Sequence, residues 1–265
     1  MKQEILKVPY NRASIDVNVY TNRRGPDWLF CIHGLQSNGH LFDGLVCQPF
    51  LSSYSTIAVD LVGFGQSAKP VDFNYYLEDQ ALVIAEIFRI LAIRKAVLVG
   101  HSLGGMIGVL LLKSLASVLS GFINMEGNLV LSDCGASKEV ADSGFADFQK
   151  KLYRDIKKRA ASESPQRAAW LEDIPDYAFY KTSQSIVEQS RSGRLPVLFA
   201  SAPCRCLFVC GEKNREKFLT VPQSVARCQI GGAGHFMLLD NPKGSYACLQ
   251  EFLIGQSASR CDLQG

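Results

Sequence analysis

The chain has 265 residues, 47% of them apolar, which is enough for one large domain with a proper core. Its 28 basic and 25 acidic residues give a formal charge of +3, a balance too mild to indicate nucleic acid or an anionic membrane as a partner. No apolar stretch at the N-terminus resembles a secretory signal and none is long enough for a membrane helix, so we expect neither.

The first half of the chain alternates strand and helix patterns, which favours an α/β fold with a doubly wound, mostly parallel sheet. Short apolar runs bounded by glycine or polar turns are typical of its buried strands. The predicted strands cover residues 4–8, 14–20, 28–33, 56–61, 96–99 and 121–125. Helices are expected over residues 76–93 and from the GHSLGG segment to about residue 119.

The pattern changes after residue 132, where no buried strand is evident until the chain nears residue 200. Phe145, Phe148, Leu152 and Ile156 recur at helical spacing and predict an amphipathic helix, whose basic opposite face we interpret as solvated. A second helix is expected over 177–189, strands over 204–210 and 226–230, and a last helix over 242–254. We therefore predict an α/β core of residues 1–132 and 200–265, interrupted by a helical cap or lid of residues 133–199.

The segment VLVGHSLGG is the strongest chemical signal in the sequence. A buried strand leads into Gly100-His101-Ser102-Leu103-Gly104, and an apolar helix follows. Such a sharp turn needs small residues two positions either side of the serine and lifts its hydroxyl above the sheet at a helix N-terminus. We interpret Ser102 as a nucleophile.

A serine hydroxyl needs a base, and the chain has four histidines. His101 lies inside the turn and is expected to point away from the site, while His40 lies on a polar loop. His33 ends a strand beside Gly34, where we expect it to shape a loop and, with Gly34, to border the substrate. His235, in GGAGHFMLLDNP, follows the last strand, and the flanking glycines let its imidazole curl back over the sheet edge. His235 is the predicted base.

The oxyanion formed during attack needs preorganised donors. The backbone N–H of Leu103, directly after the nucleophile, is one candidate. The other is the N–H of Leu35, in the loop after strand 28–33, where Gly34 lets the backbone approach the substrate.

Four segments together resemble the α/β-hydrolase superfamily: FCIHGLQSNGHLF, AVDLVGFGQSAKP, LVGHSLGG and GGAGHFMLLDNP. The resemblance covers nearly the whole chain outside the insertion, where this superfamily keeps its helical cap. It implies a serine–acid–histidine triad, a backbone oxyanion hole and no cofactor. Aspartate-nucleophile members such as epoxide hydrolases and haloalkane dehalogenases are disfavoured because Ser102 stands at the nucleophile position.

The chain departs from the family pattern at the acid. The family usually places an aspartate after the strand corresponding to 204–210, but this chain reads GEKN there, with Asn214 at the matching position. Glu126 follows the previous strand, as the acid does in some cap-bearing members. We assign Glu126 as the triad acid; Glu212 and Asp133 are alternatives, and a weak or inactive site without an acid is another.

These residues predict acyl transfer from a small-molecule carboxylic ester. Thioester or carbon–carbon bond cleavage by the same triad is the close alternative, and a non-catalytic ligand-sensing protein on this fold is a different one. We expect the cap to line an apolar acyl pocket or to bury its aromatic residues in its own core. These residues are Phe145, Phe148, Trp170 and Tyr177.

Nine cysteines at scattered positions make a poor disulfide framework. They indicate reduced thiols in a cytoplasmic protein rather than a bridged or metal-binding one. No feature of the sequence predicts an oligomeric state.

Overall fold

The computed structural model describes residues 1–255, and its centre is an eight-stranded sheet in the order β1-β2-β4-β3-β5-β6-β7-β8. From β4 to β8 all neighbouring strands are parallel, whereas β2 is antiparallel to both β1 and β4. The mostly parallel α/β fold predicted from the sequence is confirmed. The strands are β1 (Lys2–Tyr10), β2 (Ala13–Asn22), β3 (Asp27–Ile32), β4 (Tyr54–Val59), β5 (Ala96–His101), β6 (Leu119–Met125), β7 (Arg205–Gly211) and β8 (Ala226–Ile230).

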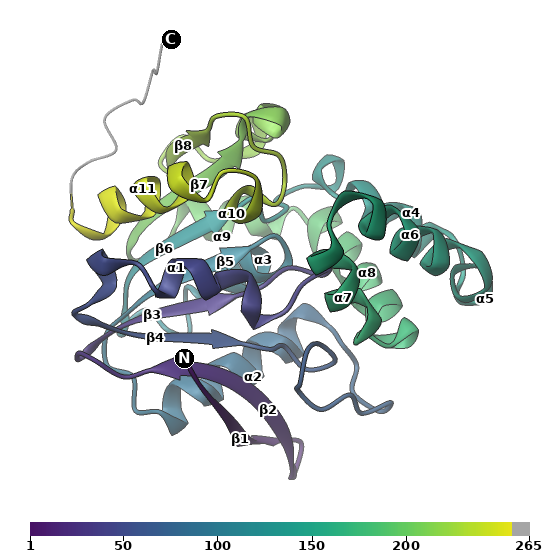
Figure 1. Cartoon of the computed structure of the whole chain (residues 1–265), viewed down its shortest axis with the longest axis horizontal. Helices are drawn as coiled ribbons and strands as arrows, with labels where there is room; N and C mark the ends of the chain where they lie inside the picture. Colours follow the sequence, from purple (N-terminus) through teal and green to yellow (C-terminus); the bar gives the residue numbers. More distant parts are fainter. Residues whose placement is uncertain (256–265) are drawn as a thin grey trace.

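Helices fill the connections between the parallel strands (Figure 1). The α-helices are α1 (Asp43–Val46), α2 (Leu77–Ile90), α3 (Leu103–Leu111), α4 (Gly135–Asp142), α5 (Phe145–Asp147), α6 (Tyr153–Glu163), α7 (Pro165–Glu172), α8 (Asp176–Arg191), α9 (Arg194–Ala200), α10 (Met237–Asp240) and α11 (Pro242–Leu253). The 3₁₀ helices are η1 (Gly39–Phe42), η2 (Pro49–Leu51), η3 (Leu131–Asp133) and η5 (Glu212–Thr220), the last of which is broken at Asn214. The segment η4 (Phe148–Leu152) is a π-helix. None of the helices described is both long and apolar enough to cross a membrane.

The core has two layers, one on each face of the sheet, because successive side chains of a strand point to opposite faces. In β3, Phe30 is fully buried in a cluster that includes Ile84 of α2. Its neighbour Leu29 is fully buried in a second cluster, with Leu249 of α11. Both faces of the parallel strands are therefore covered, which explains their continuous apolar sequences.

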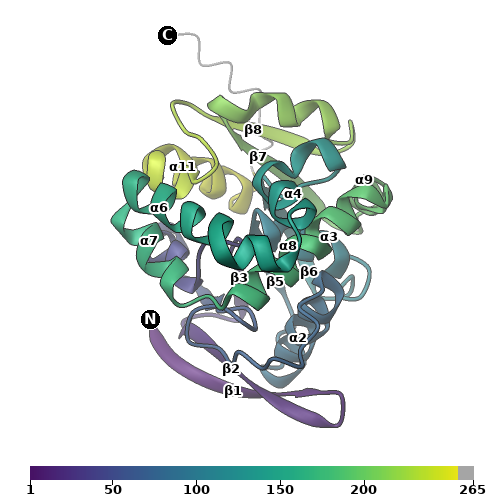
Figure 2. The same ribbon diagram turned by 90° about the vertical axis from the view of Figure 1, so that its right-hand side faces the viewer.

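All the regular structure between β6 and β7 is helical, and we call residues 133–199 the helical insertion. Its helices α4, α6, α7 and α8 lie beyond the ends to which the arrows of β3 and β4 point (Figure 1), and they stand in front of the sheet in Figure 2. The expected boundary at residues 199 and 200 falls inside α9. This helix packs against the sheet layer, where the Phe199 and Phe122 rings lie 5.6 Å apart.

The amphipathic helix of the insertion differs in detail from the sequence prediction. The π-helical turn η4 adds a residue to the apolar repeat, so the buried positions run Phe148, Tyr153, Ile156 and Ala160, and Leu152 is only partly buried. The first apolar position, Phe145, is 39% exposed. A simple period of 3.6 residues does not anticipate such a shift.

Candidate active site

Ser102 occupies a strained turn between β5 and α3, with φ 53° and ψ −116°. Positive φ is unfavourable for a residue with a Cβ atom and is typical of functional sites. The flanking glycines make the turn possible. A Cβ on Gly100 would lie 2.3 Å from the Gly104 carbonyl oxygen, and one on Gly104 would lie 2.1 Å from that of Ile32.

Ser102 follows β5, at the point in the sheet where successive strands switch from one side of β3 to the other. From β3 the chain proceeds to β4 on one side, whereas β5 pairs on the other side of β3. In open parallel sheets such a switch point opens a crevice at the carboxyl ends of the strands. A cavity of about 710 Å³ lies here and is lined by Ser102, Gly34 and Leu35 together with His235 and part of the helical insertion.

The structure brings Glu126 and His235 into direct contact. Glu126 follows β6 and is fully buried, and its Oε2 lies 2.7 Å from Nδ1 of His235. The Glu126 backbone has φ 54°, and its N–H donates to the Val209 carbonyl at 3.0 Å. The carboxylate is thus turned across the ends of β6 and β7 toward the imidazole.

Asn214, at the family's usual acid position, contacts the same carboxylate. Its Nδ2 donates to Oε2 of Glu126 at 2.9 Å, and the backbone N–H of Gly211 donates to Oε1 at 2.8 Å. Burial alone raises the pKa of Glu126, but the hydrogen bond and charge of His235, the Gly211 N–H and the charge of Lys217 outweigh it and lower that pKa to about 2. Glu126 is therefore an anion at neutral pH.

An ionised carboxylate can only accept hydrogen bonds, so the proton of a neutral His235 ring sits on Nδ1. Nε2 then carries the lone pair that a base needs. Among residues 1–255, neither Nε2 of His235 nor the Ser102 hydroxyl has a hydrogen-bond partner. The two groups line the same cavity without a hydrogen bond between them, and in ligand-free sites such bonds often form only on binding.

His101 does not point away from the site, contrary to the sequence prediction. It lines the cavity, its Nε2 lies 2.8 Å from the His235 carbonyl oxygen, and the two rings are 4.9 Å apart. Burial and the neighbouring His235 lower the pKa of His101 to about 3. A neutral His101 that donates from Nε2 ties the loop of His235 to the turn that carries Ser102.

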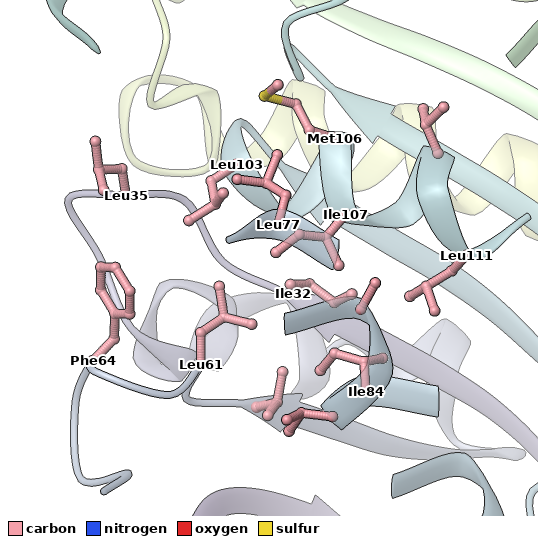
Figure 3. Close-up of a cluster of buried hydrophobic side chains, with 14 of the residues drawn as sticks. Ile32, Leu35, Leu61, Phe64, Leu77, Ile84, Leu103, Met106, Ile107 and Leu111 are labelled. Atoms are coloured by element: carbon pink, nitrogen blue, oxygen red, sulfur yellow. The ribbon is translucent and has the colours of Figure 1, made fainter. Parts of the chain in front are cut away.

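Leu35 and Leu103, the expected oxyanion donors, have anchored side chains. Both are buried in the same hydrophobic cluster (Figure 3). The Leu103 N–H is the first of α3 and has no acceptor within the helix. The loop that contains Leu35 is held by hydrogen bonds between Gly34 and Ser37. The Gly34 N–H contacts the Ser37 hydroxyl, and the Ser37 N–H donates to the Gly34 carbonyl. No acceptor for the Leu35 N–H occurs among the described residues.

The residues expected to border the substrate separate into two groups. Gly34 lines the cavity. His33 is fully buried, with Nδ1 2.7 Å from the Gly34 carbonyl oxygen and Nε2 accepting from the Leu61 N–H at 3.0 Å. Burial lowers the pKa of His33. Both ring nitrogens form hydrogen bonds with the backbone, so His33 shapes the loop and has no ring nitrogen free to bind a substrate.

The four aromatic residues of the insertion that were expected to line an acyl pocket do not line the cavity. Phe148 is fully buried and stacks on Phe179 at 5.9 Å, with Phe145 on its outer side. Trp170 is buried in the apolar layer that also holds Leu249, and the Tyr177 hydroxyl donates to the Lys69 carbonyl at 2.7 Å. Spacing alone cannot separate residues of a helical core from residues of a pocket, because both are apolar.

The cavity lining combines polar and apolar surface, where an apolar acyl pocket was expected. Its lining includes Asp133 and Asn214, which the sequence interpretation considered only in connection with the acid, and charged and amide side chains that it did not select: Gln36, Asn128, Glu163, Arg167, Lys217 and Asp240. They come from loops and short helices far apart in the chain. A polar residue bordering a cavity has the same sequence pattern as one on the outer surface, so no local signal distinguishes them.

A family model described as alpha/beta hydrolase fold matches residues 27–166, more than half of the chain. The chain belongs to the alpha/beta hydrolase fold family. The matched region runs from β3 through the turn of Ser102 and through Glu126 into the helical insertion, and ends before His235.

Two proteins of known sequence extend this hydrolase-fold assignment. The uncharacterised hydrolase YugF of Bacillus subtilis is 39% identical over 106 residues, which are 38% of this chain and 38% of that protein. The 2-(acetamidomethylene)succinate hydrolase of Mesorhizobium japonicum is 43% identical over 90 residues, 34% of this chain and 31% of that one. The chain thus matches only about a third of the length of these curated relatives.

Solved hydrolase-fold structures match over nearly the whole chain. A thermophilic esterase from Thermogutta terrifontis superimposes with a TM-score of 0.77 at 16% identity, covering 96% of this chain and 98% of the esterase. The N-acyl homoserine lactonase AidH gives 0.78 at 20% identity, with 96% and 97% covered. At this identity the likeness shows the fold alone.

Proposed function

We propose that this protein is a serine hydrolase that cleaves a carboxylic ester or a similar acyl bond of a small molecule through Ser102, His235 and Glu126. The observation that carries the proposal is the 2.7 Å contact between Glu126 and His235 Nδ1, beside a cavity that also contains Ser102. It gives His235 the tautomer and the anionic partner that a base for Ser102 requires.

In the first half of the reaction the Ser102 Oγ forms a bond to the acyl carbon, and its proton moves to Nε2 of His235. The carbonyl electron pair moves onto oxygen, where the N–H groups of Leu35 and Leu103 stabilise it. Each such donor is worth about 3 kcal/mol in related enzymes. When the carbonyl re-forms, the bond to the leaving group breaks and His235 protonates that group.

In the second half a water molecule attacks the acyl-enzyme and gives a proton to His235. Collapse of this intermediate breaks the bond to Ser102, which recovers the proton, and releases the acid. Glu126 stays ionised throughout and stabilises the protonated imidazole. The helical insertion acts as the cap in this proposal, because Arg167 and the start of α4 border the cavity.

The proposed mechanism applies equally to esters, lactones and amides, because all three are cleaved by the same acyl-transfer chemistry. An esterase, an N-acyl homoserine lactonase and a 2-(acetamidomethylene)succinate hydrolase are among the similar proteins. Their names support hydrolysis of small acyl compounds, and the charged and amide side chains in the cavity lining favour a substrate with polar groups over a plain alkyl chain.

Labelling with a fluorophosphonate probe tests the proposal, since the probe reacts with an activated serine. We expect the wild-type protein to be labelled, Ser102→Ala to lose the label and His235→Ala to be labelled at least about 100-fold more slowly. Ser114→Ala is the control, because Ser114 is exposed beyond the end of α3. A wild-type protein that resists labelling would indicate a non-catalytic, ligand-sensing protein; a label that persists in Ser102→Ala would place the nucleophile elsewhere.

A further inference from the structure

Two basic side chains border the cavity, and their surroundings differ. Arg167 pairs with Glu163 through Nη1, donates from Nη2 to Gln36 at 2.8 Å and lies over the Phe236 ring at 4.0 Å. Lys217 forms no ion pair with any carboxylate of residues 1–255. Its Nζ donates to Oδ1 of Asn128 at 3.0 Å.

The position of Lys217 is fixed by its own segment. The Lys217 carbonyl accepts from the Thr220 hydroxyl at 2.8 Å, and Phe218 packs edge-on against Phe208 of β7 with centroids 6.1 Å apart. Asn128, its partner, is only 8% exposed. A half-buried ammonium group with one neutral oxygen as its partner retains donors and charge for an anion.

The acidic groups of the cavity lining have partners other than Lys217, although the charge of Lys217 also acts on the nearby Glu126. Oδ2 of Asp133 accepts the backbone N–H groups of Leu129 and Val130, at 2.9 and 3.2 Å. Oδ2 of Asp240 accepts the N–H of Gly234 at 2.8 Å, and Glu163 is paired with Arg167. In the part of the chain described, Lys217 is therefore the cavity-lining cation that forms no ion pair with a carboxylate.

We infer that the site selects acyl substrates that carry a carboxylate, and that the ammonium group of Lys217 binds this carboxylate together with the amide group of Asn128. This inference rests on the proposed function, because Ser102 must attack the same bound molecule. Lys217 follows β7 while the oxyanion donor Leu35 follows β3, on the opposite side of Ser102. A substrate spanning both would hold its carbonyl at Ser102 and its carboxylate toward Lys217.

Protection of Ser102 from the fluorophosphonate probe tests the inference without knowledge of the natural substrate. The ligands are 4-oxopentanoate and 6-oxoheptanoate, whose ketone mimics the scissile carbonyl, each compared with its own neutral amide. We expect at least one carboxylate to protect the wild-type protein at about a tenfold lower concentration than its amide, as one charge-assisted contact allows.

Three variants separate the role of Lys217 from general effects. Lys217→Met should abolish the difference between acid and amide, and Lys217→Arg should retain it because the charge remains. Lys213→Met is the matched control, since Lys213 is exposed on the same segment and does not line the cavity.

Each outcome is decisive. Equal protection by acid and amide in the wild type, protection by neither, or a preference that survives in Lys217→Met would overturn the inference while the labelled Ser102 upholds the proposed function. Absence of labelling at Ser102 would instead overturn the proposed function, and this inference with it.

Discussion

Glu126 combines three features that are individually unfavourable: a positive φ, complete burial and a negative charge. Each costs free energy unless the surroundings compensate. Here both carboxylate oxygens accept hydrogen bonds, Oε1 from Gly211 and Oε2 from Asn214 and His235. The amide of Asn214, at the family's usual acid position, thus donates to Glu126, the proposed acid, which follows the neighbouring strand.

Substitutions can separate the role of Glu126 from that of Asn214. Glu126→Gln keeps the shape but loses the charge, and asparagine in place of the acid in a serine protease lowers turnover by about 10⁴-fold. We expect kcat on 4-nitrophenyl acetate to fall by about 10³- to 10⁴-fold in Glu126→Gln and only about tenfold in Asn214→Ala, which removes one of several donors. A harmless Glu126→Gln beside a ruinous Asn214→Ala would show that the acid is wrongly assigned.

The lowered pKa of Glu126 also predicts how stability depends on pH. The folded-state pKa of about 2 lies below the ordinary value of 4.5, so the carboxylate stabilises the fold above pH 4.5 and this contribution is lost as the pH falls toward 2. The full contribution is about 3 kcal/mol. Urea denaturation of the wild type and Glu126→Gln between pH 6 and pH 2.5 measures it. As the pH falls, the free energy of unfolding should decrease more for the wild type than for Glu126→Gln. A difference between the two proteins that stays constant with pH would contradict this assignment.

Among the elements, the helical insertion has an aromatic core of its own. Phe148 contacts the rings of Tyr153, Phe179 and Tyr180 and is fully buried, whereas Phe145 lies at the outer edge. Phe148→Ala should lower the free energy of unfolding by about 3–5 kcal/mol, since it leaves a large cavity. Phe145→Ala, the matched control, should lower it by about 1 kcal/mol. Urea denaturation compares them, and equal losses would contradict the burial that distinguishes these rings.

The elements also show where sequence reasoning succeeds and where it stops. The apolar strand runs and the helices α2, α8 and α11 lie within a few residues of their predicted bounds, because periodicity and glycine or proline punctuation mark them directly. The short helices α4, α7 and α9 carry no such periodic face over two turns. The GxSxG turn identifies Ser102 by its local geometry, but the approach of Glu126 to His235 depends on how two loops from different strands fold over the sheet edge. Lys217 lies in a run of charged residues that looks like ordinary surface.

At the scale of the whole molecule, the insertion is joined to the core unevenly. On the α8 side, the Tyr177 hydroxyl donates to Lys69, the Leu77 N–H donates to Ser185 Oγ at 3.0 Å and Gln189 donates to Glu78. On the α7 side, Arg167 reaches the core loop through Gln36 and the ring of Phe236. Trp170 of α7 is also buried in the apolar layer that holds Leu249, and Arg167 adds a polar tie between α7 and the loops that flank Ser102 and His235.

Removing that tie should loosen α7 without unfolding the protein. Because local opening free energies depend on the few contacts that hold a segment, Arg167→Met should raise hydrogen–deuterium exchange in α7 and in the loop of Gln36 by about tenfold, and leave exchange in α8 unchanged. Global stability should change by less than about 1 kcal/mol. Arg154→Met is the control, since Arg154 is exposed on α6 and, among the described residues, its side chain bonds only to the Lys150 carbonyl of the adjoining turn η4. Exchange followed by mass spectrometry distinguishes the outcomes: faster exchange confined to α7 and its loop supports a cap that opens on the α7 side, and faster exchange throughout the insertion would mean that Arg167 stabilises the insertion as a whole.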